Sequence, residues 1–515
     1  MKYPIGIQTF RDIRKGGFVY VDKTAQVHAL AQGSKYYFLS RPRRFGKSLL
    51  LSTLEAYFSG SKELFEGLAI AELEKEWVQY PVLRFDLGGK QYKSISDLTE
   101  VLFQHLVKLE GIYGVDPRFN SPEARFKDII DAAYARTGRQ VVILIDEYDK
   151  PIVDNLGNEQ LMESFRSQLQ GFYSVMKSQD EHIRFGFLTG VTKLGKLSVF
   201  SGLNNLMDIS MDAAYADVCG ISEKELREYF AESVLELAKA NGLTEQACYA
   251  ELVRRYDGYH FCEHSEGIYN PFSLLNTFAS NHFRDYWYFT GTPTFLIRYL
   301  QKGDYDLNEV AGIKVSPYEL SGTNASRPTA ITLLYQAGYL TIGGYERSTD
   351  RYTLVYPNKE VENGFLDALS RCYTPVIHNK SSLSVDKFVE DIRSGNAQML
   401  MRRLTAFFAD MDYQLMGETE LYFQNTLYVM LKLIGQQVQV ERHTSNGRID
   451  ALIQTDKYVY ILELKRDKDP QDALDQIDEK GYDWPFLADE RQVFRIGASF
   501  SSQTKRLENW KLARS

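Results

Sequence analysis

The stretch that decides the fold is Tyr36–Ser48, which reads YYFLSRPRRFGKS. Its first four residues form a short apolar run typical of a buried strand, and Leu49–Phe58 after it has helical spacing. In the pattern GxxxxGK[ST], main-chain amides cradle phosphates, the lysine reaches the β- and γ-phosphates, and the hydroxyl binds Mg²⁺. Gly46, Lys47 and Ser48 match the end of that pattern, whereas Arg41 stands where its first glycine is expected. The strand, loop and helix together predict a nucleotide-binding loop.

The second half of a nucleotide site follows a later apolar run. The further strand-like runs are Pro81–Leu87, Val141–Ile145 and Arg184–Thr192. Strands that alternate with helices predict an α/β fold, a P-loop NTPase parallel sheet with helices on both faces. We expect Asp146 to orient Mg²⁺ and Glu147 to take a proton from the attacking water. Taken alone, Asp146 and Glu147 could be solvated acids that cap a buried strand, and the loop at Gly46 argues against that alternative.

Three further residues are candidates for contacts with the nucleotide. Arg43 and Arg44 flank the loop, so they could neutralise phosphate charge or reach a neighbouring subunit of a homo-oligomer. A solvated basic loop is an equal alternative. Thr192, at the end of its predicted strand, could sense the γ-phosphate, and an ordinary strand-end threonine is the equal alternative there.

Two carboxylates near the C-terminus are predicted to face each other. Gly447–Ile453 and Tyr458–Lys465 read as strands, and Asp456-Lys457 between them suits a two-residue turn. A hairpin centred on that turn places Asp450 directly opposite Glu463. Directly opposed residues have Cβ atoms about 4.5–5.5 Å apart, so the two carboxylates could share one divalent cation.

This opposed pair has the chemistry of a metal site. Two like charges on apolar strands are unfavourable without a counter-ion, and oxygen ligands favour Mg²⁺ or Mn²⁺. The metal would polarise a scissile phosphate and lower the pKa of a water. Lys465 projects from the same strand face as Glu463 and would position or activate the nucleophile. The alternative is an edge hairpin with a Glu–Lys surface pair.

Residues on the neighbouring helical stretches could complete this site. Glu420 could add a further carboxylate, while Gln476 and Tyr482 could contact the phosphate or the water. A purely structural role is equally open for each of the three.

The middle of the chain has a different sequence pattern, in which helical spacing predominates. Glu223–Ala240 is amphipathic and helical, and Ala330–Ile342 followed by Arg351–Tyr356 reads as a helix and hairpin, as in a winged-helix module. We interpret the aromatic run Tyr286–Phe289 as core or interdomain packing rather than base stacking. After a Ser-rich linker at 379–386, helices are expected over Phe388–Asp410 and Glu418–Ile434, followed by short strands, a final helix and a strand. The predicted domains are 1–215, 216–378 and 387–515.

Length, net charge and cysteine content limit the classes of protein to which the chain can belong. The chain has 515 residues, enough for about three domains. Its 60 Lys+Arg and 68 Asp+Glu give a net charge of −8, so a nucleic-acid contact must be local to a basic groove. Four cysteines without a CxxC pair fit a reducing compartment. With no signal-peptide pattern and no apolar run of membrane-spanning length, we expect a cytoplasmic protein that does not act at a membrane.

The motifs together resemble the prokaryotic family of AAA-ATPase-like proteins that carry a C-terminal PD-(D/E)XK nuclease domain, over almost the whole chain. The name of the nuclease family has Pro before its first Asp, and here Ile449 precedes Asp450. Many relatives lack that Pro. Glu420 falls where the family has an acidic residue on a helix. The other blocks that carry the resemblance are Gly6-Ile7-Gln8, Tyr20–Thr24, Ser40–Ser48, Leu188–Thr192, Phe200–Leu206, Tyr256–Tyr259, Tyr269–Ser273, Gly447–Asp450, Glu463–Lys465 and Gln476–Tyr482.

The resemblance implies an ATP-binding P-loop AAA+/STAND-like ATPase domain at 1–215, a helical, winged-helix-like middle at 216–378 and a C-terminal restriction-endonuclease-like α/β domain, nuclease-like, at 387–515. We therefore expect an enzyme that binds and hydrolyses ATP and cuts nucleic acid, DNA in the first instance, with Mg²⁺ or Mn²⁺. The alternative is a nucleotide-state switch or partner-binding regulatory ATPase whose C-terminal fold only binds nucleic acid or is inactive.

Overall fold

The chain divides into two units in the computed structural model. The structure describes residues 1–116, 118–200, 203, 205–290, 296–297, 299–300, 305–322, 329–374, 383–410, 420–435, 439–444, 447–504 and 506–514. One unit comprises Met1–Tyr299 with Val310–Asn363, and the other comprises Leu300–Glu309 with Gly364–Ser515. Because the first unit holds both the predicted ATPase domain and most of the predicted middle domain, the three-domain boundaries stay a prediction.

The first unit is built on the predicted parallel sheet. Its five strands run in the order β2-β3-β4-β1-β5 and every neighbouring pair is parallel. All residues of the central strands β1, β3 and β4 are buried apart from Arg184, as expected for a sheet covered on both faces. The strand bounds are β1 Tyr36–Ser40, β2 Val82–Asp86, β3 Val141–Asp146, β4 Ile183–Gly190 and β5 Leu206–Asp208.

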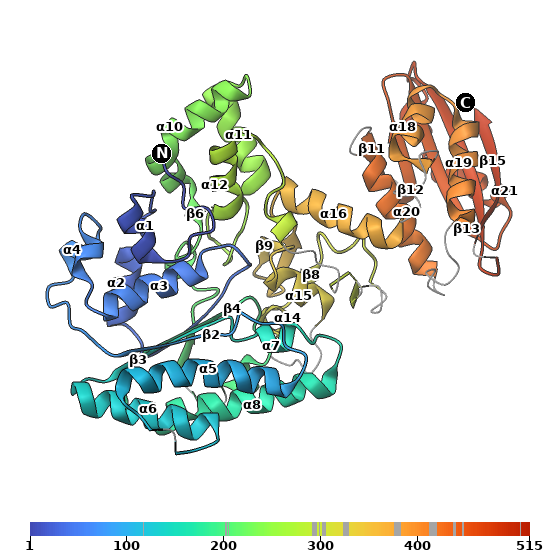
Figure 1. Ribbon diagram of the computed structural model, residues 1–515. Coiled ribbons are helices and arrows are strands. Elements are labelled where there is room, and N and C mark those ends of the chain that lie inside the picture. The colour runs from blue at the N-terminus through green and yellow to red at the C-terminus, as the bar shows by residue number, and fades with distance from the viewer. Residues whose placement is uncertain are drawn as a thin grey trace. The chain divides into compact units, whose positions relative to one another are not determined.

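Helices cover both faces of this sheet (Figure 1), which confirms the P-loop NTPase fold class. One face carries α1 Phe10–Gly16, α2 Thr24–Gln32 and α3 Lys47–Phe58. The other face carries α5 Ile95–Tyr113, α6 Pro122–Thr137 and α8 Glu159–Ser178. Short helices lie in the connections, namely α4 Ile70–Leu73, α7 Lys150–Val153 and α9 Lys196–Val199.

The middle region of the first unit is mostly helical, as predicted. Its first helix, α10 Glu223–Ala240, begins at a capping box in which Ser222 and Glu225 satisfy each other's main-chain amides. The other elements are α11 Glu245–Tyr256, α12 Pro271–Ser280, α14 Pro317–Ser321, α15 Ala330–Gln336, β6 Ile221–Ser222, β7 Ile268–Tyr269, β8 Lys314–Val315, β9 Thr341–Glu346 and β10 Arg351–Val355. The predicted helix followed by a hairpin is confirmed by α15 and the antiparallel pair β9–β10.

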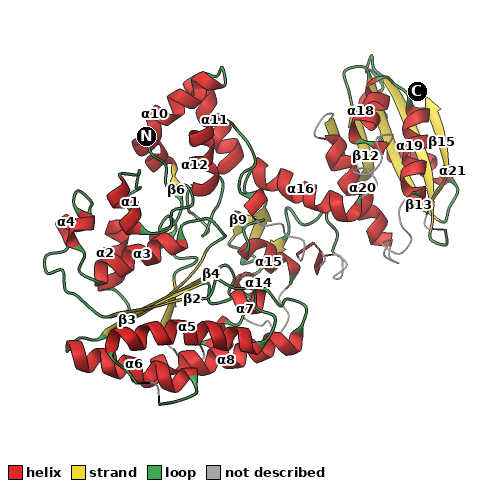
Figure 2. Cartoon of the chain, viewed as in Figure 1, coloured by secondary structure: helices red, strands yellow, loops and turns green. Residues whose placement is uncertain are grey.

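The second unit has a sheet with helices packed beside it (Figure 2). Its strands run in the order β11-β12-β13-β14-β15, and among the neighbouring pairs only β13 and β14 are parallel. Its strands are β11 Gln439–Thr444, β12 Gly447–Gln454, β13 Tyr458–Arg466, β14 Gln492–Ser501 and β15 Arg506–Arg514. Its helices are α18 Val385–Arg393, α19 Ala397–Ala409, α20 Glu420–Gly435 and α21 Pro470–Lys480. Helix α16 Lys359–Tyr373 begins in the first unit and continues into the second.

One predicted helix is two helices in the structure. The predicted range Phe388–Asp410 is interrupted between α18 and α19, where Gly395 has a φ of 75°. This left-handed conformation favours glycine and ends a helix. The side chain of Asn396 then caps the next helix by accepting a hydrogen bond from the amide of Met399 (3.1 Å).

The predicted hairpin register is confirmed. Ala451 pairs with Leu462 and Ile453 with Tyr460, and the amide of Thr455 donates to the carbonyl of Tyr458 (2.9 Å) to close the two-residue turn. Alternate residues of β13 point to opposite faces. Val459 and Ile461 pack in the core beneath α21, while the hydroxyl of Tyr460 bonds a carbonyl of α18. Glu463 and Lys465 therefore share the α21 face.

Two further predictions concern the Ser-rich linker and the absence of a membrane-spanning segment. Residues 379–382 of the predicted linker lie outside the described residues, and α18 begins at Val385. Within the part of the chain that the structure describes, no helix has the length and apolarity required to cross a membrane.

Candidate active sites

The predicted phosphate loop lies between β1 and α3. Gly46 has a φ of 99° and caps the first turn of α3. The side chain of Lys47 is buried, and its Nζ donates to the carbonyls of Arg41 (2.9 Å) and Pro42 (3.1 Å). Burial lowers the pKa of Lys47, and the nearby carboxylates of Asp146 and Glu147 oppose that shift. The loop thus places a desolvated cation opposite the acids that follow β3.

Arg41 has a structural role that sequence reasoning missed. Its guanidinium is buried and donates to main-chain carbonyls, including those of Ser210 (2.7 Å) and Tyr215 (3.0 Å). It also lies 3.9 Å from the ring centroid of Phe261. The residue in the place of the first glycine therefore ties the loop to the chain after β5 and to the middle region.

The two acids after β3 lie beside this loop. Asp146 is buried and accepts a hydrogen bond from the hydroxyl of Thr189 on β4 (2.7 Å). Glu147 has a φ of 51°. Burial raises its pKa, Lys47 opposes the shift and Asp149 adds to it. A Cβ at Gly88 would lie 2.5 Å from the carboxylate of Glu147, so only glycine leaves room for it there.

Thr192 is placed differently from its predicted role. Its hydroxyl donates to Asp149 (2.7 Å), and its amide donates to the same carboxylate (2.6 Å). Thr192 is buried and is not among the residues that line the cavity at the loop. Sequence reasoning did not single out Thr189, the β4 hydroxyl that contacts Asp146. Its place one residue before the end of the strand was the available signal.

A cavity of about 360 Å³ brings most of the other predicted residues together, but Asp146 is not among the residues that line it. The predicted residues that line it are Arg43, Arg44, Gly46, Lys47, Ser48 and Glu147. Its remaining walls come from the N-terminal segment Pro4–Gln8, from Leu49 and Lys150, from Thr290, and from Pro271, Phe272, Leu275 and Asn276 of α12. The hydroxyl of Ser48 and the carboxylate of Asp146 are hard oxygen donors, the kind that Mg²⁺ prefers. This donor set fits a Mg²⁺–nucleotide.

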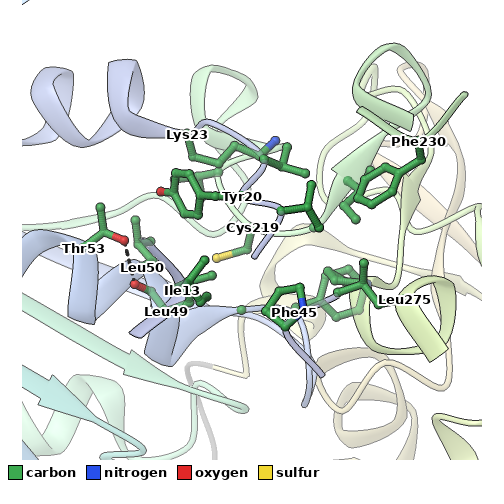
Figure 3. A pocket seen from close by; sticks show the side chains of 18 residues that line it. Ile13, Tyr20, Lys23, Phe45, Leu49, Leu50, Thr53, Cys219, Phe230 and Leu275 are labelled. Atoms are coloured by element: carbon green, nitrogen blue, oxygen red, sulfur yellow. Dashed lines mark hydrogen bonds between the residues drawn. The ribbon is translucent and has the colours of Figure 1, made fainter. Parts of the chain in front are cut away.

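An apolar recess of about 100 Å³ adjoins this cavity and shares Gly46, Leu49 and Leu275 with it (Figure 3). Tyr20, Phe45 and the thiol of Cys219 line the recess as well. A phosphate cavity beside an apolar recess is a shape that suits a nucleotide, which joins a charged end to a flat base.

The second predicted site lies on the α21 face of the C-terminal sheet. Nζ of Lys465 lies 3.4 Å from Oε1 of Glu463 and donates a short hydrogen bond to Oε1 of Gln476. Nε2 of Gln476 donates to the same Oε1 of Glu463 (2.5 Å). A helix residue therefore joins the two strand residues into one closed network.

Asp450 completes the opposed pair. Its carboxylate accepts a hydrogen bond from the amide of Leu464 (2.7 Å). Burial, and then the charge of Asp450, raise the pKa of Glu463 to about 7, and Lys465 opposes the shift. Tyr482 is buried beside the same groups, and burial raises the pKa of its hydroxyl.

These residues fit a divalent cation. Oε2 of Glu463 is buried and has no hydrogen-bond partner among the described residues, which leaves an acceptor available to a metal. No group of three or more His, Cys, Asp or Glu forms a metal site within the described ranges. Two carboxylates with water and phosphate oxygens form a ligand set that Mg²⁺ accepts. The side chain of Glu420, at the start of α20, lies outside the described residues.

Comparisons with known proteins match both ends of the chain to protein families. A family model described as a predicted AAA-ATPase matches residues 4–200, and one described as the PD-(D/E)XK nuclease superfamily matches residues 418–510. A relative from Azotobacter chroococcum mcd 1, described as an uncharacterised protein in the vnfD 5′ region, is 36% identical over 517 residues. That alignment covers 98% of this chain and 97% of the relative.

Proposed function

Because the chain belongs to the family of predicted AAA-ATPases that carry a C-terminal PD-(D/E)XK nuclease superfamily domain, we propose that it hydrolyses ATP and cuts DNA. The nucleotide state of the first unit would control cleavage by the second. The observation that carries the proposal is the network of Glu463, Lys465 and Gln476 with its partnerless buried oxygen, next to Asp450.

The first unit supports the ATPase part. Lys47 supplies positive charge for the β- and γ-phosphates, and the loop amides at the start of α3 add hydrogen-bond donors. Ser48 and Asp146 would hold the Mg²⁺ that accompanies the nucleotide. Glu147 lines the cavity, and its raised pKa makes its carboxylate a stronger base toward the attacking water.

The recess beside the loop supports a base-bearing ligand rather than free phosphate. Its apolar walls would exclude water from a flat ring, and the cavity next to it holds the charged residues. Arg43 and Arg44 are exposed at that cavity, where they could meet phosphate oxygens or a second copy of the chain.

The second unit supports the nuclease part. A divalent cation held by Asp450 and Glu463 would polarise the scissile phosphate and supply a nucleophilic water. Lys465 is oriented by Gln476 and carries a positive charge next to the place where phosphate charge develops. Tyr482 stands near the same groups and closes one side of the site.

Incubation with supercoiled and linear DNA tests the nuclease part. The wild-type protein, with Mg²⁺ or Mn²⁺, should cut in a reaction that chelation with EDTA stops, and Asp450→Ala should not cut. Cleavage that survives in Asp450→Ala would contradict the site. No cutting by the wild-type protein with either metal, with or without ATP, would favour the nucleotide switch with an inactive or merely binding C-terminal fold.

A further inference from the structure

The side chain of Trp287, in the middle region, holds the phosphate loop through a hydrogen bond to the main chain of the loop. The indole Nε1 of Trp287 donates to the carbonyl of Arg43 (3.0 Å), across 244 positions of sequence. The carbonyl of Trp287 accepts hydrogen bonds from the amide (3.0 Å) and the hydroxyl (2.7 Å) of Thr290, which lines the nucleotide cavity. Trp287 is buried and its ring packs against Tyr339, so its position is fixed.

The main-chain amide of Trp287 connects this residue to helix α16. It donates to the carboxylate of Glu360 (2.6 Å), in the first turn of that helix. Glu360 is buried, and burial raises its pKa to about 8. Helix α16 then runs without interruption from Lys359 to Tyr373, across the boundary at which the nuclease unit begins.

The rest of the loop is held by the same region. The contacts are Arg41 over Phe261, Pro42 against Gly338, Arg44 over Phe272, and Phe45 edge-on to Tyr259 and Phe261. Each of the five residues from Arg41 to Phe45 therefore touches the middle region. Nucleotide that moves or stiffens the loop must act on these partners, and among them Trp287 is bonded to α16.

We propose that Trp287 is a positioning residue that transmits occupancy of the phosphate loop to the first turn of α16, through the carbonyl of Arg43 on one side and Glu360 on the other. The inference rests on the proposed function, since it requires that the loop binds ATP. It adds the route by which ATP reaches the helix that leads into the nuclease unit. A relay of this kind needs no contact between nucleotide and nuclease, only an element that both sites bias.

Hydrogen exchange measured by mass spectrometry on the full chain, with and without the non-hydrolysable analogue AMP-PNP and Mg²⁺, tests the relay. In the wild-type protein, AMP-PNP should slow exchange at residues 41–49 and also, by about threefold or more, at residues 361–366 of α16. Trp287→Phe keeps an aromatic ring but removes the indole N–H, and Glu360→Met keeps the length of the side chain but removes the acceptor. In both variants the loop should be protected and α16 should not respond.

Glu362→Met is the matched control, because the half-buried Glu362 lies in the same turn and pairs with Lys359 (3.0 Å). It should respond as the wild-type protein does. Protection of α16 that persists in both Trp287→Phe and Glu360→Met, or a wild-type α16 that does not respond while the loop does, would overturn the relay and leave ATP binding intact. A wild-type loop that AMP-PNP does not protect would overturn the proposed function itself.

Discussion

The carboxylate of Asp450 accepts a hydrogen bond of 2.7 Å from the main-chain amide of Leu464. This bond crosses from β12 to β13 and continues the ladder in which Ala451 pairs with Leu462. It holds the carboxylate of Asp450 near that of Glu463, whose pKa Asp450 helps to raise. Folding thus brings two like charges together, an arrangement that a divalent cation would stabilise.

Replacement of Asp450 should separate its role as a hydrogen-bond acceptor from its role as a negative charge at the metal site. Asp450→Asn keeps an oxygen that can accept from Leu464 but removes the negative charge. We expect cleavage to fall by more than about a hundredfold, because changes even in outer-shell partners of a metal cost about 10–100-fold. Initial rates of plasmid nicking measure the effect. Asp456→Asn, at the exposed hairpin turn, is the control and should cut normally, whereas an active Asp450→Asn would show that its charge is not required.

The raised pKa of Glu463 predicts a pH dependence. Between its ordinary value of 4.5 and about 7, the folded chain keeps a proton that the unfolded chain has released, so without metal stability should fall as pH rises through that window. A divalent cation that binds Glu463 must displace the same proton from its carboxyl group. At limiting Mg²⁺, cleavage should therefore rise about tenfold per pH unit up to about 7 and then level off. Cleavage rates measured across pH at several Mg²⁺ concentrations check this prediction. If saturating Mg²⁺ does not move the rise in rate to lower pH, the assignment of Glu463 as a metal ligand is contradicted.

Glu147 should matter for hydrolysis but not for nucleotide binding. Glu147→Gln keeps the shape of the side chain and removes the proton acceptor. Loss of a general base costs about 10²–10⁴-fold, so ATP turnover should drop by that factor while ATP affinity stays within a few-fold. Phosphate release and a binding titration measure the two quantities. Turnover that is unchanged in Glu147→Gln would contradict the role given to Glu147, whereas turnover absent already in the wild-type protein would favour the nucleotide switch.

Packing of the middle region on the phosphate loop can be tested at a glycine. Gly338 has a φ of 88°, and a Cβ there would lie 2.6 Å from Cβ of Pro42. Gly338→Ala should therefore lower the melting temperature and weaken ATP binding, since the loop must shift to relieve the contact. Gly312→Ala is the matched control, because Gly312 also has a positive φ, of 98°, and a Cβ there meets open space. Equal effects of the two substitutions would contradict the role given to this contact.

The apolar recess gives a prediction for the base of the nucleotide. Cys219 points into the recess (Figure 3), so Cys219→Met should fill part of it. We expect ATP affinity to fall about tenfold or more while inorganic triphosphate binds as before, because only the base competes with the added side chain. Cys219→Ala, which leaves the recess open, is the control. Loss of both ligands in Cys219→Met would instead indicate a damaged loop.

Local sequence patterns were sufficient to predict the elements that carry the sites. The parallel sheet and helix α10 were predicted because apolar runs and capping residues are local signals. The hairpin register followed from the turn at Asp456-Lys457, since a two-residue turn fixes every later pair. The break at Gly395 carried a local signal as well, in the sequence Ser-Gly-Asn, which was passed over.

The contacts that sequence reasoning missed join distant parts of the chain. Trp287 and Arg43 are separated by 244 positions, and no periodicity relates them. Arg41 was assigned only as a departure from the glycine pattern, although its guanidinium bonds carbonyls about 170 positions away. The sequence left Thr192 equally open to a phosphate contact and to a structural role, and its hydroxyl bonds Asp149, an acid that the fold brings to it. Such pairs depend on tertiary packing.

The central claim is that ATP bound at Lys47 controls cleavage at Asp450, and the most direct test is the initial rate of DNA cleavage with and without ATP in the wild-type protein and in Lys47→Ala. Loss of a charged hydrogen bond costs about 1.5–3 kcal/mol, so Lys47→Ala should bind ATP about ten- to a hundredfold more weakly. We predict a metal-dependent rate that ATP changes in the wild-type protein and leaves unchanged in Lys47→Ala. A wild-type rate that is the same with and without ATP would contradict the claim.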